Sequence, residues 1–191
     1  MIKIYTLRRV DEQNLLDSKW IPKDLIWDPV ASVWLVESVY VAFYEMNHAL
    51  QKEGIPSLGI ALGYRSYAMQ KKIYLHDLFL QERALTPIVE AYHLWCDRQK
   101  PPGASEHQLG TSLDIVPQHL LKMYAPIEGM CKVEVEQAWL GDYAVDYGFI
   151  QTDKEKPWHY RYVGRGHAKK IKRLALTPDD YFQSIGDKQS L

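Results

Sequence analysis

Two stretches of the chain decide the fold: SEHQLGTSLD at residues 105–114 and PWHYRYVG at residues 157–164. Together they supply two histidines and one carboxylate, which are His107, Asp114 and His159. Gly110 lies between this His and this Asp and permits a tight turn, so we expect a loop followed by a strand. Two imidazoles and a carboxylate can hold zinc and leave a fourth coordination position open, as in catalytic zinc sites. The two stretches therefore predict a split metal site suited to hydrolysis.

The composition describes one globular domain. Its 191 residues are enough to bury a core without disulfides or a structural metal. Hydrophobic residues make up 47% and charged residues 25% of the chain, which is typical of a soluble globular protein. The formal net charge of -1 leaves no broad basic surface to neutralise a phosphate backbone, so we expect no nucleic-acid partner. The densest basic stretch, residues 165–173, is interpreted as the solvated face of a C-terminal helix.

Neither a membrane span nor an export signal is expected. No apolar run approaches the roughly 20 residues that a transmembrane helix needs. The first residues, MIKIYTLRR, lack the apolar segment and the small-residue cleavage site of a signal peptide. Action outside the cell would then need either a signal that this sequence does not include or another export route, with accumulation in the cytoplasm before release as one such route.

Alternating helix and strand patterns indicate one α+β domain with a small, mainly antiparallel sheet flanked by helices. Residues 1–30 lack sustained periodicity and are expected to be an arm packed on the domain. Residues 31–185 are expected to form the domain and residues 186–191 a tail, with a tight turn at Gly110. The expected helices cover about 32–53, begin after Ser66 and at Thr86, and cover 135–147; the expected strands cover 2–7, 58–64, 113–116, 149–150 and 159–163.

Four blocks in fixed order carry a family resemblance: GYRSYAMQ at residues 63–70, SEHQLGTSLD, YGFI at residues 147–150, and PWHYRYVG. From Pro22 to Tyr181 the chain resembles the VanY-type D-alanyl-D-alanine carboxypeptidases, zinc peptidases of bacterial cell walls that share a fold with the Hedgehog signalling domain. The resemblance implies a Hedgehog/DD-peptidase-like fold and a zinc cofactor on the three ligands named above. It also implies a carboxypeptidase that removes the C-terminal D-alanine of peptidoglycan stem peptides, acting at the bacterial cell wall.

The resemblance further implies a pocket for the free carboxylate of the peptide. Arg65 is expected to take that role, because a planar guanidinium can hold a carboxylate through two parallel hydrogen bonds. Gln70 and Ser105 are its expected hydrogen-bonding companions. Trp158 is expected to form a wall of this pocket, and a place in the core is the alternative.

One position departs from the family pattern. Relatives carry Glu immediately before Pro-Trp-His as the general base, whereas this chain carries Lys156, whose ammonium cannot accept a proton. Three interpretations stay open. Glu155 takes the role through a one-residue shift in the short connection at residues 151–156, Lys156 acts as a base in its neutral form, or the domain binds without turnover. Glu106 is not expected to replace the missing base.

Two rivals to the carboxypeptidase follow from these observations. Lys156 favours a catalytically impaired zinc-containing domain that binds the cell wall or another protein. The absence of an export signal favours a phage-type endopeptidase that cuts inside the stem peptide. The sequence leaves open the choice between D,D and L,D bonds, host or phage origin, the oligomeric state, and whether Cys96 and Cys131 pair.

Overall fold

The computed structural model describes residues 7–82, 100–122 and 134–189. Its strands are β1 (Leu25–Asp28), β2 (Val33–Val36), β3 (Leu58–Leu62), β4 (Ser112–Pro117), β5 (Phe149–Gln151) and β6 (His159–Tyr162). Its helices are α1 (Glu37–Lys52), α2 (Tyr67–Glu82), α5 (Glu134–Tyr143), α6 (Arg165–Leu174) and α7 (Pro178–Gln189), with short 3-10 helices η2 (Glu106–Leu109), η3 (Gln118–Lys122) and η4 (Ala144–Tyr147). The helix expected from Thr86, nearly all of the strand expected at residues 2–7, and both cysteines lie outside the described residues.

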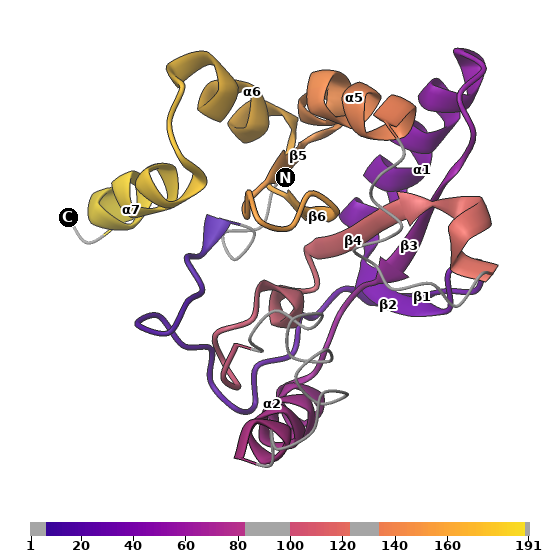
Figure 1. The fold of residues 1–191 in the computed structure, drawn as a ribbon. Coiled ribbons are helices and arrows are strands. Elements are labelled where there is room, and N and C mark those ends of the chain that lie inside the picture. The colour runs from indigo at the N-terminus through magenta and orange to yellow at the C-terminus, as the bar shows by residue number, and fades with distance from the viewer. Residues whose placement is uncertain (1–6, 83–99, 123–133, 190–191) are drawn as a thin grey trace.

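A four-stranded antiparallel sheet forms the centre of the fold, with the order β3-β4-β6-β5 (Figure 1). All six residues of β4 are buried, as expected for a strand with neighbours on both sides. The register pairs Asp114 with His159 and Ser112 with Arg161 across β4 and β6. The two stretches that the sequence singles out therefore lie on neighbouring strands. The predicted α+β class with a small antiparallel sheet is confirmed.

The segment before α1 differs from the sequence prediction. The helix expected from residue 32 begins at Glu37, because the preceding residues Val33–Val36 form β2 and pair with β1. Valine and tryptophan fit a pleated strand better than a helix, and these residues dominate the segment. The turn is closed by Asp28, whose carboxylate accepts the Val30 N–H at 2.8 Å. The β-hairpin at residues 25–36 thus spans the expected boundary between the N-terminal arm and the domain.

The main core lies between α1, α5 and the sheet. Helix α1 buries the side chains of Val39, Phe43, Met46 and Leu50, which recur at helical spacing. Burying each such side chain contributes roughly 1.5–3 kcal/mol. A second cluster joins β5 and the end of β6 to α6 and α7, and it contains Ile150, Val163, Ala168, Ile171, Tyr181 and Phe182. Figure 1 shows α6 and α7 on the β5 and β6 side of the molecule, away from α2.

The start of α2 and the end of the segment α5–η4 lie where the sequence predicts them. Ser66 precedes α2 and its hydroxyl accepts the Met69 N–H at 3.2 Å, as an N-cap does. The helix expected over 135–147 is divided into α5 and η4, and it ends at Gly148 with a left-handed φ of 92°. The basic stretch 165–173 lies on α6 and exposes its lysines, as predicted. None of the helices in the described ranges has the length and apolar character that crossing a membrane requires.

The turn that joins η2 to β4 depends on Gly110. Its φ of 68° is left-handed, and a Cβ there would lie 3.0 Å from Leu25 Cδ2 and 3.1 Å from Val36 Cγ2. Both the conformation and the lack of space favour glycine. The Gly110 carbonyl also accepts the Val36 N–H at 3.0 Å, which ties the turn to the hairpin. This predicted turn is confirmed, and it carries the chain from His107 to Asp114.

Candidate metal centre

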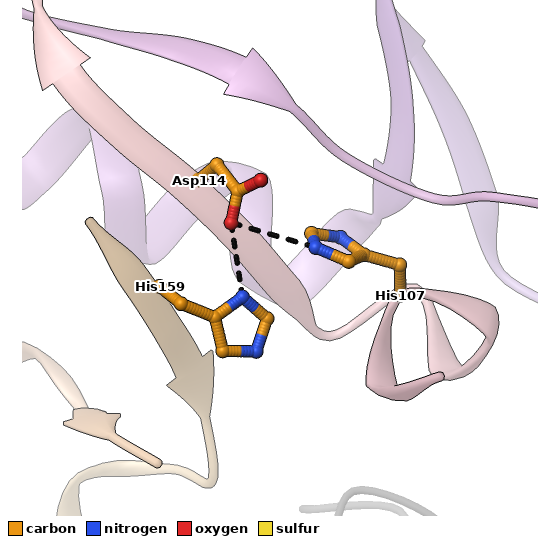
Figure 2. Close-up of side chains that lie close together, drawn as sticks. All are labelled: His107, Asp114 and His159. Carbon is orange, nitrogen blue, oxygen red and sulfur yellow. Dashed lines mark hydrogen bonds and ion pairs between the residues drawn. The ribbon is translucent and has the colours of Figure 1, made fainter. Parts of the chain in front are cut away.

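Three buried side chains from three different elements converge at one point (Figure 2). His107 comes from η2, Asp114 from β4 and His159 from β6. The Oδ1 atom of Asp114 lies 3.4 Å from His107 Nε2 and 2.9 Å from His159 Nδ1. The three atoms that could serve as ligands all lie within 4.8 Å of one another. The structure therefore brings together the three residues that the sequence names as ligands, in a group that could hold a metal ion.

The second nitrogen of each imidazole has its own acceptor. His107 Nδ1 lies 2.9 Å from the Gly63 carbonyl oxygen, and His159 Nε2 lies 3.1 Å from Glu106 Oε2. Because a carbonyl and a carboxylate can only accept, these nitrogens carry the protons and donate. When a ring is neutral with its proton on that nitrogen, the other nitrogen has a lone pair for a metal, and in both rings it faces Asp114. In the metal-free protein a protonated His159 donates from Nδ1 to Asp114 at 2.9 Å. The donor set therefore fits a divalent metal such as zinc.

Sequence reasoning missed the role of Glu106. Its Oε2 also accepts the Thr152 hydroxyl at 2.7 Å, and its Oε1 accepts Arg161 Nη1 at 2.6 Å. Arg161 is completely buried, so the ion pair is shielded from solvent. The available signal was the alternation along β6: residues 159 and 161 point to the same face of a strand, so an arginine there approaches whatever contacts the histidine.

The charges of the site shift one another's pKa values. Burial alone would lower the pKa of His159, but hydrogen bonds to Asp114 and Glu106 outweigh burial and raise it to about 9. Burial would raise the pKa of Asp114, yet the nearby His107 and His159 hold it well below its usual range. The pKa of Glu106 is likewise held low, against burial, chiefly by the guanidinium of Arg161. The site thus keeps both carboxylates ionised.

A pH dependence of stability follows for the metal-free protein. The folded-state pKa of His159, about 9, exceeds its unfolded value of about 6.5, so its proton stabilises the fold fully below pH ~6.5. That contribution is lost as the pH rises through about 9. We expect the Tm of chelator-treated protein to fall over this interval, measured by circular dichroism, and His159→Gln to remove that part of the fall. A wild-type Tm that stays constant over the interval would contradict the prediction.

Arg65 lies beside the metal group and is held in place by Gln70. Its backbone N–H donates to the His107 carbonyl at 3.1 Å, and its Nη1 donates to Gln70 Oε1 at 2.8 Å. Gln70 is buried, and its own amide donates to the Lys100 carbonyl at 2.6 Å. Burial lowers the pKa of Arg65, and the negative charge of Asp114 counteracts this shift. Gln70 therefore orients the guanidinium.

The other two predicted pocket residues, Ser105 and Trp158, form their contacts within the described chain with neighbouring segments and not with the metal group. Ser105 is buried immediately before η2, and its carbonyl accepts the Gln108 N–H at 3.1 Å. Trp158 is half-buried and packs in a small cluster around Val116, while its carbonyl accepts the Ile115 N–H at 2.8 Å. These contacts give Trp158 a share in the core. Roles in substrate binding stay predictions for both residues.

The connection between β5 and β6 carries the two candidates for the base position. Glu155 is exposed, and its backbone N–H donates to Asp153 Oδ1 at 3.0 Å. Lys156 is half-buried, its Nζ lies 3.8 Å from Asp153 Oδ2, and its carbonyl accepts the His159 N–H at 2.9 Å. The turn thus sets Lys156 beside a carboxylate and leaves the Glu155 side chain in solvent.

The antiparallel sheet and its buried His-Asp-His group make this an α+β domain with a candidate metal centre. Comparison with known proteins gives the family, because residues 32–165 match the VanY family, described as D-alanyl-D-alanine carboxypeptidase. The chain belongs to this family, as the sequence resemblance predicts. Among curated proteins it is 30% identical to the putative carboxypeptidase YodJ of Bacillus subtilis, over 94% of this chain and 67% of YodJ.

Solved structures share the fold. The LD-carboxypeptidase LdcB is similar with a TM-score of 0.73 and 28% identity, over 93% of this chain and 86% of LdcB. A mutant of the vancomycin-resistance D,D-pentapeptidase VanY in complex with Zn(II) is similar with a TM-score of 0.68 and 23% identity, over 93% of this chain and 98% of that one. The predicted Hedgehog/DD-peptidase-like fold is therefore confirmed.

Proposed function

We propose that this protein is a zinc-dependent carboxypeptidase that removes the C-terminal D-alanine of peptidoglycan stem peptides at the bacterial cell wall. The observation that carries the proposal is the convergence of His107 Nε2, Asp114 Oδ1 and His159 Nδ1 beside a guanidinium. Membership of the VanY family supports the reaction, and the Zn(II) complex of the VanY mutant supports the metal.

One group of residues would bind the metal, and a second group would bind the substrate. His107, Asp114 and His159 would hold zinc, which polarises a scissile carbonyl and makes a water nucleophilic near neutral pH. Arg65 would hold the terminal carboxylate of the peptide through two parallel hydrogen bonds, with Gln70 keeping the guanidinium in orientation. Ser105 would add a hydroxyl contact. A substrate held at its free end presents its last peptide bond to the metal group.

Glu155 is the side chain that we assign as general base. Glu106 lies behind His159 and uses both oxygens on Arg161, Thr152 and His159. Asp153 is occupied by the Glu155 N–H and lies near the ammonium of Lys156. An ammonium has no lone pair, which removes Lys156 in its charged form. Glu155 keeps a solvent-exposed carboxylate on the segment that leads to His159, and as the base it would have to turn toward bound substrate.

The reaction is tested with a muropeptide that carries a pentapeptide stem. Zinc-loaded protein is expected to release one D-alanine, detected by mass spectrometry as the loss of a single residue. Fragments larger than one residue would support an endopeptidase instead. Release from a tetrapeptide stem alone would indicate the L,D bond that LdcB is named for. No release at full zinc occupancy would support the binding domain that Lys156 favours.

The role of Arg65 gives a second measurement. We expect Arg65→Lys to raise KM about tenfold to a hundredfold, because a charge-assisted hydrogen bond contributes roughly 1.5–3 kcal/mol and each 1.36 kcal/mol is tenfold. The wild type should also discriminate against a peptide with an amidated C-terminus, and Arg65→Lys should lose most of that preference. Arg173→Lys on the exposed face of α6 is the matched control. Unchanged discrimination in Arg65→Lys would exclude this role.

A further inference from the structure

We propose that Glu106 is a positioning residue of the metal centre, which holds His159 with its Nδ1 toward Asp114. Arg161 and Thr152 in turn hold Glu106. The inference rests on the zinc site of the proposed function, but it concerns metal binding and not the choice of substrate. The sequence pattern assigns no role to Glu106.

Glu106 contacts the ring nitrogen of His159 that points away from Asp114. Glu106 Oε2 lies 3.1 Å from His159 Nε2, whereas Asp114 Oδ1 lies 2.9 Å from Nδ1 of the same ring. Figure 2 shows the two ring nitrogens of His159 pointing to different sides, with Nδ1 toward Asp114. A carboxylate in this position fixes the tautomer and the orientation of a metal-binding imidazole and increases its basicity. Glu106 thus acts on the metal through His159.

Thr152 and Arg161 fix the carboxylate of Glu106 from two directions. The Thr152 hydroxyl donates at 2.7 Å to Oε2, the same oxygen that accepts from His159. Arg161 Nη1 donates at 2.6 Å to Oε1. With both oxygens engaged, the carboxylate cannot rotate without breaking one of these partly buried hydrogen bonds, which costs roughly 1–3 kcal/mol. The oxygen facing His159 is therefore held in one place.

Arg161 is itself fastened by segments far from it in the sequence. Its Nη2 donates to the Arg8 carbonyl at 2.5 Å, and its guanidinium carbon lies 4.3 Å from the centre of the Phe182 ring on α7. The side chain is completely buried, so its charge depends on Glu106 and these neighbours for stabilisation. The support of His159 thus extends through Glu106 and Arg161 to residues near both ends of the described chain.

Glu106→Gln tests the proposal, because the amide has the shape of the carboxylate but only one acceptor oxygen. An NH₂ facing Arg161 would oppose a donor with a donor. An NH₂ facing His159 would favour the tautomer with the proton on Nδ1, which blocks the nitrogen aimed at Asp114. We expect the zinc affinity, measured by chelator competition, to fall about tenfold to a hundredfold. Glu53→Gln, the same change at an exposed residue, should leave it unchanged.

A structural ion pair without influence on the metal is the alternative outcome. If Glu106→Gln folds, judged by circular dichroism and Tm without metal, and its zinc affinity stays within about twofold of wild type, the proposal is overturned. If Glu106→Gln does not fold, Glu106→Asp keeps the charge beside Arg161 but withdraws the oxygen from His159, and Thr152→Val keeps the ion pair. Unchanged zinc affinity in both would equally overturn it, and a loss in Glu106→Asp would support it.

Zinc binding and peptide cleavage are measured separately in this design. A wild type that binds zinc but releases no D-alanine would end the proposed function while leaving the role of Glu106 to be decided by the zinc affinities. A wild type that cleaves normally, with a Glu106→Gln variant of unchanged zinc affinity, would end the inference about Glu106 alone.

Discussion

We expect Asp114→Asn to remove hydrolysis, with kcat/KM reduced at least about a thousandfold. Asn replaces the anionic oxygen that lies 3.4 Å from His107 Nε2 and 2.9 Å from His159 Nδ1 with a neutral amide. Metal polarisation contributes several kcal/mol to transition-state stabilisation, and each 1.36 kcal/mol is tenfold in rate. The measurement is the rate of D-alanine release together with the zinc content of the purified variant. Zinc content should fall in parallel with activity.

Asp146→Asn is the matched control for this variant. Asp146 is exposed and pairs with Lys169 at 3.0 Å on the surface, where an ion pair contributes little to stability. Its substitution should leave both zinc content and activity at the wild-type level. An Asp114→Asn protein that keeps full zinc content and cleaves at the wild-type rate would show that the ligand assignment is wrong.

The second large effect, on kcat, is expected at Glu155, the proposed general base. Glu155→Gln should lower kcat about a hundred- to ten-thousandfold, the usual contribution of a positioned general base. Zinc affinity should not change, because Glu155 is exposed and the three proposed ligands come from other positions. Steady-state kinetics at saturating zinc separates the two quantities. A loss in kcat without a loss of metal would identify a role in proton transfer.

Lys156→Glu is the opposing experiment, since it restores the residue type that relatives carry before Pro-Trp-His. With Glu155 as the base, a second carboxylate one position later should give little gain. A strong rise in hydrolysis in Lys156→Glu, with no effect of Glu155→Gln, would show that the wild type is the impaired binding domain. The two variants together therefore distinguish a shifted base from a missing one.

Much of the site could be predicted from sequence because its three central residues lie in short motifs with local structural reasons. Gly110 makes the turn between His107 and Asp114 recognisable, and the pattern around residue 159 predicts a strand for the second histidine. That this strand pairs with β4 is known only from the structure. The α+β class follows from the same alternation of patterns. Local periodicity and turn residues are the signals that a single sequence carries most clearly.

The contacts that the sequence did not predict are those between distant segments. The pairing of Glu106 with Arg161 spans 55 positions and depends on the register of β4 with β6. The alternation along β6 puts Arg161 on the same face as His159, but no spacing in the sequence places Glu106 opposite them. The hairpin was missed for a different reason: residues 33–36 continue the apolar rhythm of α1, and only their pairing with β1 makes them a strand. Tertiary pairing outweighed the helical pattern at that boundary.

The burial of Arg161 makes the catalytic centre sensitive to damage far from it. A protease cut that detached the segment around Arg8 would take away the carbonyl that accepts from this guanidinium. Loss of α7 would likewise remove the Phe182 ring beneath it. Either change would expose a cation that holds the carboxylate behind His159. Limited proteolysis near the ends of the described chain is therefore expected to disturb the metal centre as well as the fold.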